Sequence, residues 1–376
     1  AWGRLANSNG IPDNLFRPGL RTGQGAIFGD NVYPSIVAAF RPDPNIGYEI
    51  VGGYDAGFDI RVLDNRLNAE FSIYNRTTSN ILTNITLPNL DIPYTTNLGK
   101  ITNKGFEVSM GWKDNIGEDF TYNIAGNLSY NKNIVNSIGD GFDFQLVGNG
   151  GINLTKAGQS IGHFFGYRQV GIYQSTADLV NQPSFANSLP GDIAYADISG
   201  NGSISSDDRE YLGSPFPSYN FGGAITLNYK GIDVMIEGQG QAGHKIYAQR
   251  RAANFTALNF EANRLNAWTG SGTTNVEPIM NNSRANNFLF STYYLEPGDY
   301  FRIRTLQLGY NFTPALLSRV GIYNARIYVS GQNIKTWSRV TGYSPEPLIG
   351  DILGGGADNG AYPVPAVYSL GVNLTF

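Results

Sequence analysis

The sequence predicts an all-β fold, a transmembrane antiparallel β-barrel with long extracellular loops, of which about ten strands lie in this chain. The first reason is composition: only 15% of the 376 residues are charged, whereas 47 are glycine, 23 tyrosine and 21 phenylalanine. This composition suits aromatic girdles and glycine-rich turns. No apolar run reaches the roughly 18 residues of a membrane helix, and the mean hydropathy is -0.22. Barrel strands escape that test because lipid-facing and lumen-facing residues alternate.

The second reason is the alternation at the end of the chain. From Tyr368 to Phe376, apolar and polar side chains alternate up to the last residue, so one face of an extended strand is apolar. A membrane barrel needs a last strand that pairs with its first and shows lipid an apolar stripe. The aromatic C-terminal residue therefore indicates a barrel-closing strand, although an edge strand of a soluble β-sandwich has the same local pattern.

Earlier segments show the same period of two, beginning with a strand at residues 1–8. A tight turn at Asp64-Asn65 joins two of them, as expected for an antiparallel hairpin. The apolar positions of the predicted strands are Tyr54, Ala56, Phe58, Ile60 and Val62; Leu67, Ala69, Phe71 and Ile73; Phe106, Val108, Met110 and Trp112; Phe120, Tyr122, Ile124, Leu128 and Tyr130; Phe221, Ile225, Leu227 and Tyr229; Ile232, Val234 and Ile236; Leu306, Leu308, Tyr310 and Phe312; and Ala325, Ile327 and Val329.

Short turns and long connections alternate along the chain, as in barrels with periplasmic turns and long outer loops. If every short turn is periplasmic, residues 134–218 contain an even number of crossings. We interpret them as one long extracellular excursion, although residues 164–173 are strand-like. A second extracellular loop is expected at residues 243–293, with a helix near residues 252–268. The same count places the C-terminus in the periplasm.

Charge and cysteine content exclude several kinds of partner and site. The net charge of -4 gives no basic surface for nucleic acid. The chain has no cysteine, so it has neither disulfides nor thiolate metal sites. Ala1 already lies in strand-like sequence, and an outer-membrane protein must be exported, so a signal sequence and further residues are expected upstream.

Several segments together resemble the SusC/RagA-like family, the TonB-dependent outer-membrane transporters of Bacteroidetes. Their order and spacing cover nearly the whole chain, with Ala6 in place of a glycine that is usual in the first segment. The segments are Ala1-Trp2-Gly3-Arg4-Leu5-Ala6-Asn7, Pro44-Asn45-Ile46-Gly47-Tyr48-Glu49, Asn97-Leu98-Gly99-Lys100-Ile101-Thr102-Asn103-Lys104-Gly105-Phe106-Glu107, Ser330-Gly331-Gln332-Asn333-Ile334, Tyr343-Ser344-Pro345-Glu346 and Tyr362-Pro363 with the closing strand.

The resemblance implies that this chain, residues 1–376, is the C-terminal part of a barrel of 22 strands. It also implies an N-terminal plug, contact with the TonB complex through the missing N-terminal part, and a SusD-like surface lipoprotein as a lid. The expected function is import of glycan or peptide oligomers across the outer membrane, without catalysis. The alternative is a non-transporting structural or docking barrel in a larger outer-membrane assembly.

Residues 197–208 have the layout of a twelve-residue calcium loop, in which oxygen ligands surround one Ca²⁺. Gly202 occupies the sharp turn and Ile204 is expected to anchor the loop inward. Because only two ligands are carboxylates, we expect a structural ion with a dissociation constant of about 10⁻⁴ to 10⁻³ M. An Asx/Gly turn without metal is the alternative. The predicted ligands are Asp197, Ser199, Asn201, the Ser203 carbonyl and Asp208.

The other candidates carry less specific signals. His163 and His244 are the two histidines, and neither has metal spacing or a nucleophile pattern nearby. Arg302 and Arg304 share a face with Leu306, so a β-bulge or a position above the membrane is expected; a lumen-facing pair would instead bind an anionic substrate. Loop aromatics that could stack on sugar or hold peptide, or else pack within the loops or against a lipoprotein, are Phe142, Phe144, Trp268, Trp337 and Tyr343.

Overall fold

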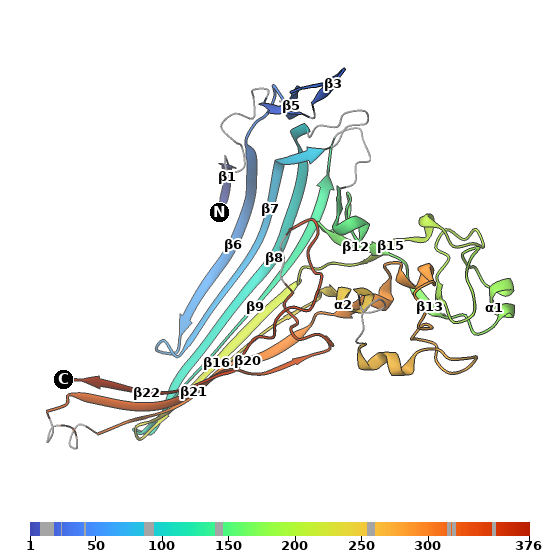
Figure 1. The fold of residues 1–376 in the computed structure, drawn as a ribbon. Helices are drawn as coiled ribbons and strands as arrows, with labels where there is room; N and C mark the ends of the chain where they lie inside the picture. The colour runs from blue at the N-terminus through green and yellow to red at the C-terminus, as the bar shows by residue number, and fades with distance from the viewer. Residues whose placement is uncertain are drawn as a thin grey trace.

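The computed structural model describes residues 1–7, 19–23, 25–40, 43–85, 94–139, 146–253, 260–313, 317, 321–347 and 351–376. Its main feature is one curved antiparallel sheet (Figure 1). The sheet has ten strands in the order β1-β6-β7-β8-β9-β16-β17-β20-β21-β22, which confirms the predicted fold class and strand number. The strands are β1 (Trp2–Asn7), β6 (Glu49–Val62), β7 (Leu67–Ile85), β8 (Tyr94–Ile116), β9 (Phe120–Ser137), β16 (Tyr219–Tyr229), β17 (Ile232–Ala242), β20 (Tyr300–Asn311), β21 (Asn324–Ser338) and β22 (Val367–Thr375).

The strand register brings the apolar positions onto one face of the sheet. Phe58 lies opposite Phe71, which lies opposite Val108 on the next strand. Val108 pairs in turn with Leu128, and Leu128 with Phe221. Because side chains alternate between faces, this register gives the sheet an apolar face and a polar face. The apolar face is widely exposed, with 55% for Phe58 and 71% for Leu370, as lipid contact requires.

Aromatic side chains gather near both ends of the apolar face. Near one end, Phe106 stacks on Tyr130, with ring centroids 5.7 Å apart, and Tyr130 contacts Tyr219 at 4.9 Å. Near the other end, Phe120 contacts Tyr229 at 6.4 Å. β16 runs from Tyr219 to Tyr229 and is 11 residues long, which matches the roughly 9–11 residues of a tilted membrane strand. The two aromatic groups therefore mark the girdles of a membrane-spanning region.

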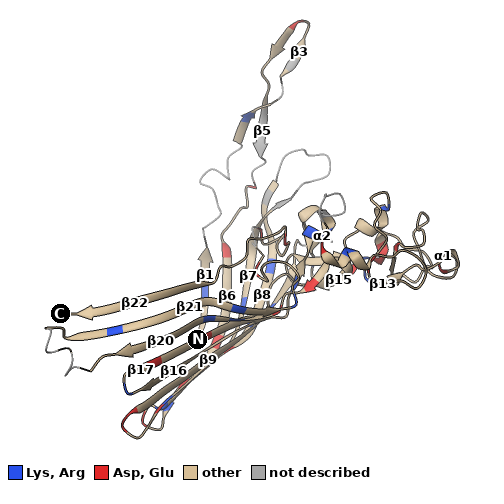
Figure 2. Cartoon of the chain, turned by 60° about the horizontal axis from the view of Figure 1, so that its bottom comes forward, with Lys and Arg blue, Asp and Glu red and all other residues tan. Residues whose placement is uncertain are grey.

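Long and short connections leave opposite ends of the sheet. Residues 63–66, 117–119 and 230–231 make short turns at one end, whereas residues 138–218, 243–299 and 339–366 leave the other. We call the described parts of these three long connections the loop layer. Within the described residues, 138–218 add no strand to the ten-stranded sheet. A further connection carries a hairpin that projects beyond the sheet (Figure 2), made of β2 (Gly19–Thr22), β3 (Ala26–Phe28), β4 (Asn31–Tyr33) and β5 (Ile36–Phe40).

The loop layer has its own small sheets and short helices. β10, β11, β12 and β15 form one sheet, and β13 with β14 and β18 with β19 form two pairs. Their bounds are β10 (Leu146–Gly148), β11 (Asn153–Thr155), β12 (His163–Gly166), β13 (Gln169–Ile172), α1 (Thr176–Asn181), β14 (Ile193–Tyr195), β15 (Glu210–Gly213), β18 (Lys245–Tyr247), α2 (Gln249–Ala253) and β19 (Leu295–Pro297), with 3₁₀ turns at Asn149–Gly151, Ser206–Asp208, Ala262–Asn266, Ala285–Phe288 and Thr292–Tyr294.

An aromatic core holds the loop layer together. Its rings pack at angles, as between Tyr293 and Tyr294, whose centroids are 4.8 Å apart, a favourable arrangement for aromatic pairs. Tyr294 also meets Tyr247 edge to face at 6.2 Å. Phe164, from the connection of residues 138–218, packs on Phe290 of residues 243–299 with ring centroids 5.7 Å apart, so these two connections fold as one packed unit. The buried members are Phe164, Tyr167, Ile172, Ile193, Tyr195, Ile204, Tyr247, Tyr293 and Tyr294.

The prediction of a helix near residues 252–268 holds at residues 252–253, which belong to α2 (Gln249–Ala253), and is wrong at residues 260–268, which contain no α-helix. Residues 262–266 form a 3₁₀ helix in which Arg264 is buried and Leu265 is exposed. Phe255 and Leu258, which suggested an apolar helix face, lie outside the described residues. Among the helices that the described ranges contain, none has the length and apolar character needed to cross a membrane.

Candidate functional site

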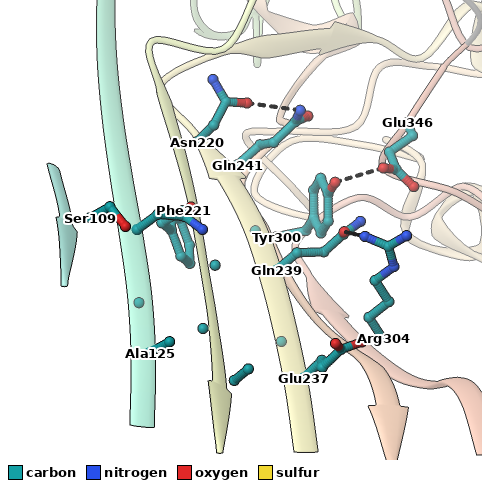
Figure 3. A pocket seen from close by; sticks show the side chains of 17 residues that line it. Ser109, Ala125, Asn220, Phe221, Glu237, Gln239, Gln241, Tyr300, Arg304 and Glu346 are labelled. Atoms are coloured by element: carbon teal, nitrogen blue, oxygen red, sulfur yellow. Dashed lines mark hydrogen bonds between the residues drawn. The ribbon is translucent and has the colours of Figure 1, made fainter. Parts of the chain in front are cut away.

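A cavity of about 570 Å³ lies on the polar face, where β9, β16, β17 and β20 meet the loop layer (Figure 3). Its floor is low because small residues lie on neighbouring strands: Ala125 pairs with Ala224, and Gly222 lies two residues away on β16. Amide side chains rise around this floor. Gln241 donates from Nε2 to Asn220 Oδ1 at 3.0 Å, which ties neighbouring strands across the cavity wall.

Glu346 reaches the cavity from the connection between β21 and β22. Its carboxylate accepts a hydrogen bond of 2.6 Å from the Tyr300 hydroxyl and lies 2.7 Å from Arg302 Nη1. Arg302 also donates from Nε to Thr336 at 2.9 Å, and only 4% of the residue is exposed. The charge-assisted contacts therefore tie the loop layer to the sheet beside the cavity.

A β-bulge places both arginines of β20 on the polar side. The pairing between β20 and its neighbours shifts between Ile303 and Thr305, so Arg302 pairs with Gln239 while Leu306 stays on the apolar face. The expectation of a bulge is confirmed. The two arginines differ in their contacts: Glu346 neutralises Arg302, whereas Arg304 is exposed and donates from Nη1 to Gln239 Oε1 at 3.4 Å. They do not form the free cationic pair that an anion site would need.

Sequence reasoning missed most residues of this cavity. Asn220, Gln239 and Gln241 are the polar members of alternating strands, so alternation places them on the polar face. Their convergence depends on the pairing of β16 with β17, which no single segment encodes. Glu346 belongs to the segment Tyr343-Ser344-Pro345-Glu346, whose resemblance to a family motif was the only sequence signal for it.

The predicted calcium loop keeps its five ligand residues close together. Asp197 accepts amide hydrogen bonds from Gly200 and Gly202 at 2.7 and 2.8 Å, and Ser199 Oγ donates to the same carboxylate at 3.2 Å. Asn201 Oδ1 accepts from the Ser203 amide at 2.9 Å. These bonds fold the loop around Asp197.

Asp208 closes the loop from the other side and is 0% exposed. Its carboxylate accepts amide hydrogen bonds from Ser199 at 2.9 Å and from Ser205 at 2.7 Å, the second as part of a capping box. Burial raises the pKa of Asp208, but the hydrogen bonds from Ser199 and Ser205 outweigh it and lower the pKa to about 2. A carboxylate that stays charged suits either a cation or the loop amides.

A loop pocket of about 560 Å³ lies beside a buried ion cluster in the loop layer. At the centre of the cluster, Arg250 lies 2.6 Å from Asp358 Oδ2, 3.2 Å from Glu296 Oε1 and 2.8 Å from Glu261 Oε1. The neighbouring Arg251 shares Glu296 at 2.9 Å. The cluster thus joins α2 to β19 within residues 243–299 and to the distant connection of residues 339–366.

The two histidines are packed in the loop layer. His163 is 2% exposed and His244 is 6% exposed. Burial lowers the pKa of both; a backbone hydrogen bond with Ser160 partly offsets this for His163 and the nearby Asp299 carboxylate does so for His244. Among the residues that the structure describes, no group of three His, Asp or Glu side chains could hold a metal ion.

The predicted loop aromatics have different environments. Trp337 lies on β21 and stacks on Phe301 at 5.9 Å, so it belongs to the sheet. Trp268 donates from Nε1 to Gln174 at 3.1 Å and is packed within the loop layer. Tyr343 is 74% exposed at the loop pocket. Phe142 and Phe144 lie outside the described residues.

Curated relatives cover almost all of the chain. It is 30% identical over 380 residues to "TonB-dependent receptor P3" of Formosa agariphila, with 93% of this chain and 36% of the relative aligned. It is 25% identical to "TonB-dependent receptor SusC" of Bacteroides thetaiotaomicron, with 93% and 34% aligned. The chain therefore spans about a third of the length of these relatives. No family model matches it.

Solved structures agree with this fold. The RagAB peptide transporter superposes with a TM-score of 0.79 at 20% sequence identity, covering 100% of this chain and 40% of the solved chain. The same transporter in its open-open state gives a TM-score of 0.80. The relatives and the ten-stranded sheet lead to one conclusion: the chain belongs with the SusC-like TonB-dependent receptors of the outer membrane and is a part of such a protein.

Proposed function

We propose that the protein containing this chain imports a nutrient oligomer, which the loop layer captures and the polar face of the barrel conducts. The observation that carries this proposal is the cavity of about 570 Å³ directly beneath the loop layer. Its amide-rich wall offers donors and acceptors to a hydrated cargo, whereas the opposite face of the same strands is apolar. In this arrangement the short turns and the C-terminus face the periplasm, and residues 134–218 and 243–293 lie outside the cell.

The proposed import has partners beyond this chain. A SusD-like surface lipoprotein would cover the loop layer, and the TonB complex would act through a part of the receptor that these residues do not include. On the loops, Val180 is 80% exposed and Val276 is 60% exposed, so these apolar side chains would be accessible to such a partner. Outer-membrane lipid would surround the apolar face.

Filling the cavity tests the proposal. In cells that carry the full-length receptor, Ala224→Trp is expected to abolish depletion of an oligosaccharide and peptide mixture from the medium, measured by mass spectrometry. The indole would occupy the floor between β9 and β16. The matched control is Ile225→Trp, since Ile225 lies on the apolar face and is 38% exposed; uptake should persist at comparable receptor levels in the membrane.

Two outcomes would contradict import through this site. If Ala224→Trp leaves depletion unchanged, cargo does not pass this part of the polar face. If cells that lack the whole receptor deplete the mixture as well as cells that carry it, the barrel is better explained as a structural or docking component of a larger outer-membrane assembly.

We further propose that residues 197–208 hold a structural Ca²⁺. The donor set fits this ion because Asp197, Ser199, Asn201, the Ser203 carbonyl and Asp208 are all hard oxygen donors. Their mutual contacts keep them in one small loop: Ser199 donates from its hydroxyl to Asp197 and from its amide to Asp208. When bound, the ion would supply positive charge that cross-links the two carboxylates and stiffens the loop.

Isothermal titration of the EDTA-treated receptor with CaCl₂ tests this second proposal. We expect heat with a dissociation constant of about 10⁻⁴ to 10⁻³ M, lost in Asp197→Asn. Asp207→Asn is the control, because Asp207 is exposed in the same loop and is not a predicted ligand. Equal heat from the Asp197→Asn variant would leave residues 197–208 as a metal-free Asx/Gly turn.

A further inference from the structure

Two lysines lie directly opposite each other on the lipid-facing side of the sheet. Lys104 of β8 pairs with Lys132 of β9, just as Phe106 pairs with Tyr130 two residues further along the two strands. Side chains two residues apart share a face, and the register between β8 and β9 does not shift between residues 101 and 116. Both lysines therefore continue the apolar face beyond its aromatic girdle, toward the loop layer.

The girdle sets the depth of this pair in the membrane. Two residues span about 6.6 Å along a strand, and a strand tilt of about 40° reduces this to about 5 Å along the membrane normal. The headgroup layer of one leaflet is about 5–7 Å thick. Because Phe106 and Tyr130 mark the edge of the apolar band, Lys104 and Lys132 lie at the depth of the lipid headgroups.

The described residues bring no counter-charge to the pair. Lys104 and Lys132 are exposed, and neither side chain makes an ion pair or a hydrogen bond with another described residue. Alternation places every aspartate and glutamate of β6 to β9 on the polar face except Asp114, which lies beside the short turn at the other end. Like charges directly opposite each other destabilise an antiparallel pair, so an anion bound between them would stabilise this part of the sheet.

Neutral hydrogen-bonding groups lie next to the pair on the same face. Asn75 of β7 pairs with Lys104 and donates from Nδ2 to the Tyr54 hydroxyl at 3.3 Å. One step nearer the loop layer, Thr77 pairs with Thr102, and their hydroxyl oxygens are 3.0 Å apart. Amide and hydroxyl groups beside ammonium groups complement an anion with several oxygen acceptors, such as a phosphate.

A third lysine extends this surface along β8. Lys100 pairs with Ser79 of β7 in the same register that pairs Lys104 with Asn75, so Lys100 and Lys104 share a face. Lys100 is exposed as well and lies about 13 Å from Lys104 along the strand. We call Lys100, Lys104 and Lys132 the lysine patch. Its length matches a headgroup that carries more than one anionic group better than a single small ion.

The place of the lysine patch favours a lipid over a soluble anion. Water and salt weaken the attraction of exposed lysines for a small free anion. A phosphorylated lipid gains a second contribution, because its acyl chains can pack on the apolar face directly below the patch, where Val108 pairs with Leu128. Basic residues next to a membrane-spanning surface bind anionic headgroups for the same reason.

We infer that the lysine patch binds the phosphorylated headgroup of an outer-leaflet lipid. One phosphate lies between Lys104 and Lys132, and the acyl chains of the lipid lie along β8 and β9. The inference goes beyond the proposed import function and takes from it only the orientation that places the loop layer outside the cell. The bound lipid removes the repulsion between β8 and β9 and fixes the depth of these strands in the membrane.

Native mass spectrometry of the purified full-length receptor in detergent tests the inference. The probes are lipid A with two phosphates and the same lipid A after enzymatic removal of both. We expect Lys104→Gln/Lys132→Gln to weaken binding of the phosphorylated probe about thirtyfold, or ~2 kcal/mol, and Lys104→Arg/Lys132→Arg to retain it. The control is Lys113→Gln/Lys230→Gln, which removes two exposed lysines at the short-turn end of the sheet and should bind like the wild type.

Three results would overturn the inference. Equal affinity of the wild-type and glutamine receptors for phosphorylated lipid A places any bound lipid elsewhere. If the dephosphorylated probe shows the same dependence on Lys104 and Lys132, the patch does not recognise phosphate. If inorganic phosphate displaces the lipid and chloride at the same ionic strength does not, the patch is a site for free anions. Import is scored separately by depletion of the medium, so each of these results leaves the import proposal standing.

Discussion

Replacing Arg250 with alanine is expected to destabilise the loop layer by about 3 to 5 kcal/mol, the cost of breaking a buried ion cluster on one side. The Arg250 side chain is 11% exposed, whereas the side chains of Asp358 and Glu296 are 0% and 5% exposed. Without Arg250, the Asp358 carboxylate keeps no ion-pair partner among the described residues. The segments that the cluster joins should then separate, while the ten-stranded sheet remains paired.

Limited proteolysis of the purified receptor, with cleavage sites mapped by mass spectrometry, measures this effect. Cleavage should rise by orders of magnitude within residues 243–299 and 339–366, because proteolysis follows the population of the opened form when opening is fast. Arg66→Ala is the matched control: its side chain is 50% exposed and lies 3.2 Å from Asp114, and an exposed pair contributes about 0–1 kcal/mol. Equal cleavage in the two variants would show that the cluster does not hold the loops.

Gly105→Ala is expected to destabilise the sheet by about 1–3 kcal/mol or more, because it overpacks a site with no space for a methyl group. A Cβ at this position would overlap the Tyr130 carbonyl oxygen and lie 2.8 Å from Tyr74 Oη. The backbone oxygen can move only if β8 and β9 separate. The Tyr74 hydroxyl, which donates to Asn131 across Gly105 at 3.0 Å, would also lose its bond.

Thermal unfolding of the purified receptor and the amount assembled in the outer membrane measure this second effect. Gly126→Ala is the control, since a Cβ there would meet its nearest neighbour, the Gly222 carbonyl oxygen, at 3.6 Å. Both glycines lie within strands of the same sheet, so both changes alter backbone freedom in the unfolded chain in the same way. If the Gly105→Ala and Gly126→Ala receptors unfold at the same temperature, the result contradicts the steric argument.

The sheet was predictable from sequence because its information is local. Alternation along one strand identifies the strand and its apolar face without knowledge of the neighbours. A break in the alternation was informative too. Strict alternation would place Arg302 and Arg304 on the apolar face with Leu306, so an irregularity was expected, and the structure has a bulge there. Trp337 was assigned wrongly to the loops because the same irregularity, which skips residues 333 and 334 on β21, interrupts the period of two before it.

The loop layer was not predictable because its contacts join distant positions. The Ile193 amide donates to Asn287 at 2.8 Å, and Arg250 reaches Asp358. No periodicity within one segment indicates such pairs. The residues that we propose as calcium ligands are close together because they belong to one short turn, whereas the polar cavity needed Asn220 and Gln241 from two strands to meet.

The side chains that meet across glycine also bear on how such a sheet avoids misfolding. Two antiparallel strands that slip by two residues keep their faces and most of their ladder bonds, so nearest-neighbour pairing distinguishes the slipped form poorly. Tyr74 on β7 bonds Asn131 on β9 above Gly105, and Asp233 on β17 bonds Arg326 on β21 above Gly309. Each bond forms only when three strands are correctly aligned together. During assembly, an intermediate with a slipped register would lack these bonds and would be less stable than the correctly paired one before the next hairpin adds to it.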